Sequence, residues 1–132
     1  MNSSKTLSEL RDLAKQDLFV FAKAVCGFDW LNKKIHGPLC MLLENYENYK
    51  KLAIVLPRGW LKTTLCSQAY PMWRAIRDVN TRILLVQNTH TNAVAKLRTI
   101  RETVEKNPLF RSLYPEVLPD STCVWKSDSL CL

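Results

Sequence analysis

Glycine is scarce in this chain, and long apolar runs are absent. Its 132 residues include only three glycines, and no apolar stretch approaches the roughly 18 residues of a membrane-spanning helix. Residues 18–22 are apolar but short, and residues 1–5 lack the apolar core of a signal peptide. These absences predict a soluble, cytoplasmic protein without a membrane partner.

Clustered metal ligands are also missing. The five cysteines are widely spaced without a C-x-x-C pair, and the chain has only two histidines. A structural metal site is therefore not expected. An odd number of scattered cysteines with apolar neighbours predicts reduced, mostly buried thiols.

Positive charge exceeds negative charge. The chain has nineteen Lys and Arg residues and twelve Asp and Glu residues, which gives a net charge of +7. Such a field favours polyanions, including nucleic acids and nucleotides. The 47% hydrophobic and 23% charged fractions are ordinary for one globular domain.

Local signals predict a series of helices. Residues 6–9, Thr-Leu-Ser-Glu, form a capping box that opens a helix ending near Cys26, before Gly27. Pro38 suits the first turn of a second helix, which continues to about Glu47. The other helices expected are residues 62–76 with a kink or break near Pro71, a helix that Thr89 or Thr91 caps and that ends at Asn107-Pro108, and a short turn at 108–114.

Two continuous apolar runs, residues 52–56 and 83–86, are predicted as strands buried on both faces. Residues 122–125 and 130–132 also have strand composition. Strands that alternate with helices predict an α/β fold with a mostly parallel sheet. Because so few strands leave a raw sheet edge, we expect this edge and the apolar C-terminus to favour self-association or poor solubility.

The segment between the first predicted strand and the next helix carries the chemistry. Residues 56–64, Leu-Pro-Arg-Gly-Trp-Leu-Lys-Thr-Thr, match part of a P-loop, G-x-x-x-x-G-K-[ST]. In a P-loop, backbone N–H groups wrap a phosphate and the lysine neutralises its charge. Lys62 and Thr63 fit the last two positions, but Leu56 and Leu61 stand where the pattern has glycine. A strand, turn and helix with an exposed lysine is the alternative interpretation.

With Arg58 and Gly59 in the loop, Pro-Arg-Gly-x-x-Lys-Thr-Thr resembles the deviant Walker A motif of the terminase large subunit. Terminases are the ATP-driven motors that pump DNA into tailed-phage heads. Residues 82–89 with the charged helix after them, and residues 107–116 with Trp125 and Lys126, resemble the next segments of that family. The resemblance spans most of residues 28–132.

The resemblance implies a three-layer P-loop NTPase fold, apparently truncated and preceded by two N-terminal helices. Residues 1–50 would hold these helices and an adenine-side region. Residues 51–132 would form an incomplete ATPase core that has the Walker A motif but lacks the Walker B motif and the nuclease domain.

The resemblance also implies a site for ATP and Mg²⁺. Lys62 would bind the β- and γ-phosphates, Thr63 the Mg²⁺ ion and Arg58 the γ-phosphate, which makes Arg58 and Lys62 the catalytic candidates. Leu61 in the place of glycine puts the curvature of the loop in question, because its side chain must point away from the phosphates. Backbone N–H groups would come from Gly59, Trp60 and Leu61, with Thr64 beside them.

Trp30 and His36 lie where the family keeps residues around the adenine base. Stacking of Trp30 on a purine is chemically reasonable, but a tryptophan so near Phe28 also fits a core. His36 precedes Gly37 and Pro38, and is alternatively a capping or hydrogen-bonding residue.

Two further polar groups of residues have competing interpretations. Residues 87–90 end the second predicted strand, at the edge where ligands bind in α/β proteins. Contact with DNA or with the loop competes there with helix capping by Asn88 and Thr89. Lys96, Arg98 and Arg101 give the following helix a basic face, which a solvated surface also explains.

No apolar run is followed by the carboxylate that hydrolysis needs to organise Mg²⁺ and water. In the resembling family that acidic strand lies further downstream, followed by a nuclease domain. We therefore expect this chain to bind nucleotide weakly and not to hydrolyse it alone.

In its complete form the resembling protein, encoded by a phage or prophage, would package viral DNA in the host cytoplasm. The partners that the resemblance implies are double-stranded DNA, the portal protein and the small terminase subunit. The full-length large subunit would form a homo-oligomeric ring around the DNA. Another P-loop motor, such as a helicase, is one alternative. A non-catalytic DNA- or portal-binding remnant is the other.

Overall fold

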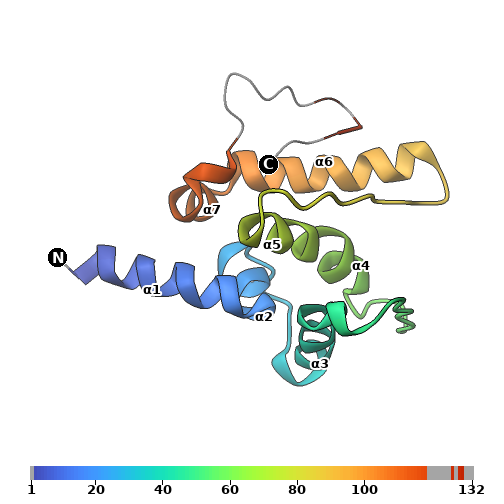
Figure 1. Ribbon diagram of the computed structural model, residues 1–132, viewed down its shortest axis with the longest axis horizontal. Coiled ribbons are helices and arrows are strands. Elements are labelled where there is room, and N and C mark those ends of the chain that lie inside the picture. The colour runs from blue at the N-terminus through green and yellow to red at the C-terminus, as the bar shows by residue number, and fades with distance from the viewer. Residues whose placement is uncertain (1, 119–125, 127, 130–132) are drawn as a thin grey trace.

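The computed structural model describes residues 2–118, 126, 128 and 129, with side chains from residue 5 onward. Every regular element in this described part is a helix (Figure 1). The α-helices are α1 (Asn2–Gln16), α2 (Leu18–Val20), α3 (Lys33–Glu44), α4 (Lys62–Thr64), α5 (Tyr70–Arg77), α6 (His90–Lys106) and α7 (Pro108–Leu113). Two π-helical stretches, η1 (Phe21–Val25) and η3 (Leu65–Ala69), and two 3₁₀ turns, η2 (Tyr46–Asn48) and η4 (Pro115–Val117), complete the set.

The expected α/β fold with a mostly parallel sheet is wrong, because the described part of the chain is all-α and contains no strand. The expected three-layer P-loop architecture is also wrong for this described part, because it requires a sheet. Residues 52–56 and 83–86, which were predicted as strands, run as non-helical segments (Figure 1) with no backbone hydrogen bond to any described residue. A strand exists only through the ladder that it forms with a neighbour. The other two strand candidates, 122–125 and 130–132, lie outside the described residues.

The N-terminal helix begins earlier than predicted and breaks in its middle. Asp17 has extended backbone angles, φ −119° and ψ 110°, and its side chain accepts a hydrogen bond from the Val20 N–H over 3.0 Å. Asp17 is therefore the N-cap of α2 and separates it from α1. The predicted end is confirmed: the helical run stops at Cys26, and Gly27 follows with φ 77°.

The second helix also begins earlier than predicted, at Lys33. The Asn32 side chain caps α3 by accepting a hydrogen bond from the Lys34 N–H over 2.9 Å. Pro38 lies inside the helix instead of opening it. The polar side chain of Asn32 was a stronger start signal than the proline.

The remaining helices confirm the sequence signals. The helix predicted over residues 62–76 is present as a continuous helical run from 62 to 77. Its π-helical stretch η3 ends at Ala69, two residues before Pro71, and Pro71 lies in the first turn of α5. Thr89 is the N-cap of α6, since its hydroxyl accepts a hydrogen bond from the Asn92 N–H over 3.2 Å. Asn107 ends α6 and caps α7.

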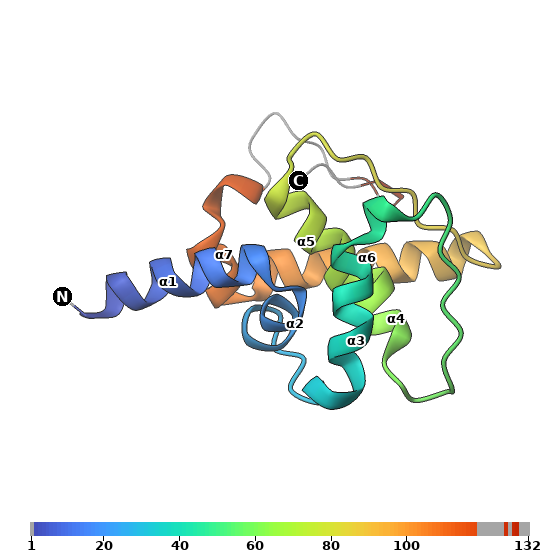
Figure 2. The same cartoon turned by 60° about the horizontal axis from the view of Figure 1, so that its bottom comes forward.

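One apolar core joins these helices, and α3 lies crosswise to α1 and α6 (Figure 2). Trp73 of α5 is fully buried, and its indole N–H donates a hydrogen bond to the Ala14 carbonyl of α1 over 3.0 Å. Phe21, Phe110 and Tyr114 form an aromatic cluster in which Phe21 meets the other two rings edge to face. Residues before and after position 50 thus share a single core.

The described cysteines are free thiols, as the sequence predicts. Cys26 and Cys40 are buried and unpaired, as predicted, and Cys66 is half-buried. Cys123 and Cys131 lie outside the described residues. No helix in the described part is long and apolar enough to cross a membrane.

Candidate phosphate-binding loop

The loop that carries the P-loop-like motif turns sharply and leads directly into a helix. The Trp60 N–H donates a hydrogen bond to the Pro57 carbonyl over 3.4 Å, which closes a four-residue turn. Gly59 is the third residue of this turn and has φ 84°, the positive value that a type II turn requires there. Leu61 follows with φ 49° and ψ 21°, and the helical run starts at Lys62.

The structure shows how a leucine is accommodated at position 61, where the P-loop pattern has glycine. Leu61 adopts the left-handed conformation in which glycine is normally found, at a cost of roughly 1–2 kcal/mol for a residue with a side chain. Its half-buried side chain packs against the hydrophobic core. The side chain is therefore directed into the protein, and it does not fill the space in front of the loop.

The backbone amides at the start of the helical run are free. Leu61 provides no side-chain cap, and within the described part the N–H groups of Lys62, Thr63 and Thr64 have no acceptor. Unpaired N–H groups at a helix start carry the positive end of the helix dipole. An anion with several oxygen atoms can accept hydrogen bonds from all three.

Two cations flank these amides without carboxylate partners. Arg58 is exposed and Lys62 is half-buried, and neither belongs to an ion pair in the described part of the chain. Burial raises the pKa of the Cys66 thiol, and the nearby Lys62 ammonium opposes that rise. The ion pairs that do form lie elsewhere: Arg11–Glu116, Arg74–Glu47, Arg98–Glu102 and Arg101–Glu105.

The remaining loop residues are accessible to a ligand. Trp60 and Thr63 are exposed, and Thr64 is half-buried. The Thr63 hydroxyl is the candidate Mg²⁺ ligand. No group of three or more His, Cys, Asp or Glu side chains that could hold a metal ion occurs among the described residues. The predicted ligand Thr63 can therefore offer a metal ion one hydroxyl oxygen, and a bound anion or water would have to provide the others.

The two adenine candidates have different surroundings. Trp30 is 86% exposed, so the alternative that it belongs to the core is wrong. His36 is buried, and its Nδ1 accepts a hydrogen bond from the Asn32 N–H over 2.9 Å, which is the hydrogen-bonding alternative. No hydrogen bond or ring contact joins either residue to the loop among the described residues. Their role at an adenine base stays a prediction.

The polar residues before and on α6 are engaged in local interactions. Thr89 caps the helix, and the Asn88 side-chain oxygen accepts a hydrogen bond from the Asn92 amide over 2.7 Å. Arg98 and Arg101 pair with Glu102 and Glu105 one turn later, at 3.2 Å and 3.0 Å. These ion pairs partly neutralise the basic face of α6. This face should therefore attract polyanions less strongly than its arginine content alone predicts.

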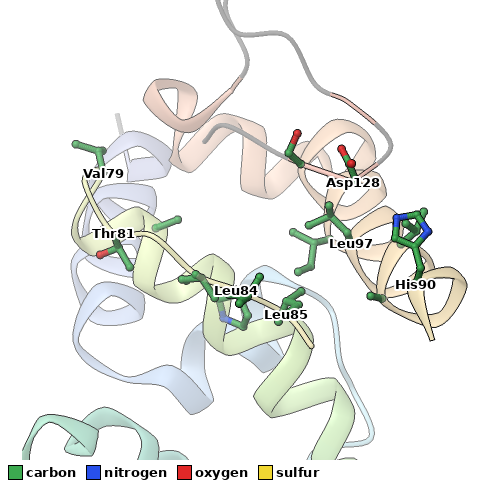
Figure 3. Close-up of a pocket in the computed structure, with 14 residues that line it drawn as sticks. Val79, Thr81, Leu84, Leu85, His90, Leu97 and Asp128 are labelled. Carbon is green, nitrogen blue, oxygen red and sulfur yellow. The ribbon is translucent and has the colours of Figure 1, made fainter. Parts of the chain in front are cut away.

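Sequence reasoning missed one feature of this region. A groove of about 520 Å³ lies between α5, residues 79–85 and α6 (Figure 3), and Asp128 and Ser129 also line it. None of the residues 57–64 lines this groove. The only sequence feature that pointed to this groove was the apolar run at residues 83–86, which was predicted to form a buried strand.

Comparison with known proteins does not add to these observations. Neither a known protein family, nor a curated protein, nor a solved structure matches this chain.

Proposed function

We propose that residues 57–64 bind the phosphates of ATP, and that the chain is the N-terminal ATPase segment of a DNA-packaging terminase large subunit. The observation that carries the proposal is the helix start at Lys62. Three backbone amides and two cations, Arg58 and Lys62, that have no partner among the described residues meet at a turn with two positive-φ residues.

Each of these features suits a polyphosphate. A phosphate oxygen accepts hydrogen bonds from backbone N–H groups without the steric demands of a side chain. Lys62 acts as a point charge and Arg58 as a planar fork, and both bind phosphate. The net charge of +7 raises the local concentration of anions around the chain. The resemblance of residues 57–64 to a Walker A motif supports a nucleoside triphosphate as this polyphosphate, and the resembling family uses ATP.

Mg²⁺ would accompany the nucleotide. The exposed Thr63 hydroxyl fits this ion as a single ligand, and the phosphates would provide others. Hydrolysis needs a carboxylate in addition, and neither predicted strand run, 52–56 or 83–86, is followed directly by Asp or Glu. We therefore propose nucleotide binding for this chain and turnover for the complete motor, with double-stranded DNA, the portal protein and the small terminase subunit as its partners.

Titration of a fluorescent ATP analogue with Mg²⁺ tests the loop. We expect saturable binding that Lys62→Ala weakens by about tenfold or more, because a hydrogen bond to a charged group contributes about 1.5–3 kcal/mol. Lys5→Ala is the matched control. It removes the same charge from an exposed position on α1, and we expect it to change the affinity by less than about twofold, as an exposed and screened charge should.

Two results would contradict the proposal. One is the absence of saturable binding by the folded chain. The other is an equal loss of affinity in Lys62→Ala and Lys5→Ala, which would mean that ATP responds to net charge and not to this loop.

A further inference from the structure

Helix α3 has apolar side chains on two opposite faces. Its inward face is buried in the protein and consists of His36, Leu39, Cys40 and Leu43. Its outward face is formed by Ile35, Pro38 and Met41. Ile35 is 45% and Met41 is 64% exposed, and Pro38 between them is exposed as well. Figure 1 shows α3 at the edge of the molecule, so this outward face is open to a partner.

The outward face is a continuous apolar ridge. Ile35, Pro38 and Met41 follow one another at intervals of three residues, so they share about a third of the helix circumference. Single exposed apolar side chains are ordinary on a protein surface, but a stripe along one helix marks a contact. No α3 residue lines the groove between α5 and α6. A projecting ridge fits a flat partner, whereas a bound peptide usually occupies a groove.

The charges beside this ridge are positive. Lys33 and Lys34 are exposed at the start of α3, and neither belongs to an ion pair in the described part of the chain. Residues 30–43 include no Asp or Glu. Glu44, at the end of the helix, is directed toward α2, where its carboxylate accepts a backbone hydrogen bond over 2.6 Å. The outward face therefore complements a negatively charged surface.

An exposed tryptophan precedes the helix. Trp30 is 86% exposed and lies two residues before Asn32, the N-cap of α3, so it is at the same end as the two lysines. Tryptophan is enriched where a membrane meets water, because its ring is apolar and its N–H is polar.

The aliphatic side chains distinguish a membrane from a nucleic acid. Trp30 and the lysines would also suit a single-stranded nucleic acid, whose bases stack on aromatic rings. Ile35 and Met41 offer neither a stacking plane nor a hydrogen bond to a base. Aliphatic groups do gain free energy when they enter the apolar region of a bilayer.

We propose that the outward face of α3 binds reversibly to the surface of a membrane that contains anionic lipids. The apolar ridge enters the boundary between headgroups and acyl chains, Trp30 lies in the interface, and Lys33 and Lys34 contact acidic headgroups. The expectation that the chain has no membrane partner depended on the absence of a spanning run. Binding to a membrane surface needs no such run.

Flotation of the full chain with vesicles tests this proposal. One set of vesicles contains equal parts of phosphatidylcholine and phosphatidylserine, and the other contains phosphatidylcholine alone. We expect binding to the anionic vesicles that weakens as salt is added, because salt screens the attraction to headgroups. Lys33→Gln/Lys34→Gln should bind about thirtyfold more weakly, at roughly fivefold per lysine. Lys5→Gln/Lys106→Gln is the matched control, since it removes two charges from exposed positions on α1 and α6 and should bind almost as the wild type does.

A second pair of variants tests the apolar ridge. Ile35→Ser/Met41→Ser should weaken binding to the anionic vesicles by about tenfold or more, because two apolar side chains no longer enter the bilayer. Leu84→Ser/Val86→Ser removes two exposed apolar side chains outside α3 and should bind as the wild type does. All four side chains are exposed, so folding should persist, and helix content by circular dichroism checks it.

Three results would overturn the proposal. The first is a wild-type chain that does not float with the anionic vesicles. The second is an equal loss in the α3 variants and in their controls, which would assign binding to net charge or to general hydrophobicity. The third is binding of a single-stranded oligonucleotide in place of vesicles, lost in Lys33→Gln/Lys34→Gln, which would assign this face to nucleic acid. None of these substitutions touches residues 57–64, so the result is independent of the phosphate-loop proposal.

Discussion

At the residue scale, Leu61 shows how a departure from a motif is accommodated. The P-loop pattern has glycine at this position because the backbone must adopt positive φ, and Leu61 does so with φ 49°. The strain is retained because the side chain is held against the core. The sequence indicated that this position was unusual. It did not indicate how the strained backbone is held in place, because that depends on the packing of the Leu61 side chain against the core.

This arrangement predicts that glycine at position 61 gives a more stable protein than alanine does. Leu61→Ala loses the packing of the side chain and keeps the left-handed strain. Leu61→Gly loses the same packing and removes the strain, so we expect it to be more stable than Leu61→Ala by about 1 kcal/mol. Urea unfolding of both variants measures the difference. An alanine variant as stable as the glycine variant, or more so, would show that no strain is stored at this residue.

Individual residues also show which parts of the candidate site could be predicted from the sequence. The lysine, threonine and arginine of the loop were found because their order is a local motif. The burial of His36 and the exposure of Trp30 were not predictable, because both depend on how α3 packs against the rest of the protein. Neighbouring aromatic residues were a poor guide to burial in the case of Trp30.

At the element scale, helices were predicted better than strands for a physical reason. A helix closes its hydrogen bonds within itself, so caps such as Thr89 and Asn107 are determined by local sequence. A strand depends on a neighbour that may lie anywhere in the sequence. Residues 52–56 and 83–86 have the continuous apolar composition of buried strands, but no described residue forms a backbone hydrogen bond with them.

Glu44 illustrates an element boundary that sequence reasoning missed. Its carboxylate, at the end of α3, accepts a hydrogen bond from the Leu18 N–H at the start of α2 over 2.6 Å. Together with the Asp17 side chain, it holds the break between α1 and α2. A residue 26 positions away in the sequence thus helps to satisfy a helix start.

Glu44 also predicts a pH dependence of stability. Burial raises the pKa of its carboxyl above 4.5, the Leu18 N–H opposes that rise, and the Asp17 charge adds to it. A carboxyl whose pKa is raised by folding stabilises the fold at low pH, and this contribution is lost as the pH rises through the folded-state pKa. The free energy of unfolding should therefore contain a contribution from Glu44 that declines as the pH rises above 4.5.

Glu44→Gln isolates that contribution, because glutamine keeps an oxygen acceptor for Leu18 and does not titrate. Relative to the wild type, we expect this variant to gain stability as the pH rises from about 4.5 to 7. Urea unfolding at several pH values gives both curves. Parallel curves across this range would mean that Glu44 ionises as freely in the folded chain as in the unfolded one.

At the scale of the whole molecule, one helical core positions the loop. Trp73, on the helical run that Lys62 begins, is tied to α1 through the Ala14 carbonyl, so this helical run is anchored in the centre of the protein. The loop therefore starts a fixed helix, and its free amides have a defined direction. A phosphate site of this kind needs no partner strand in order to present its donors.

The most direct test of the phosphate-loop proposal is to follow the backbone amide resonances of the ¹⁵N-labelled chain as Mg²⁺ and ATP are added. We expect the largest chemical-shift changes at the amides of Gly59, Trp60, Leu61, Lys62, Thr63 and Thr64, saturating together with a single dissociation constant, and absent with adenosine at the same concentration. Changes centred on any other region, or no saturable change at these six amides, would contradict the proposal that this loop binds phosphate.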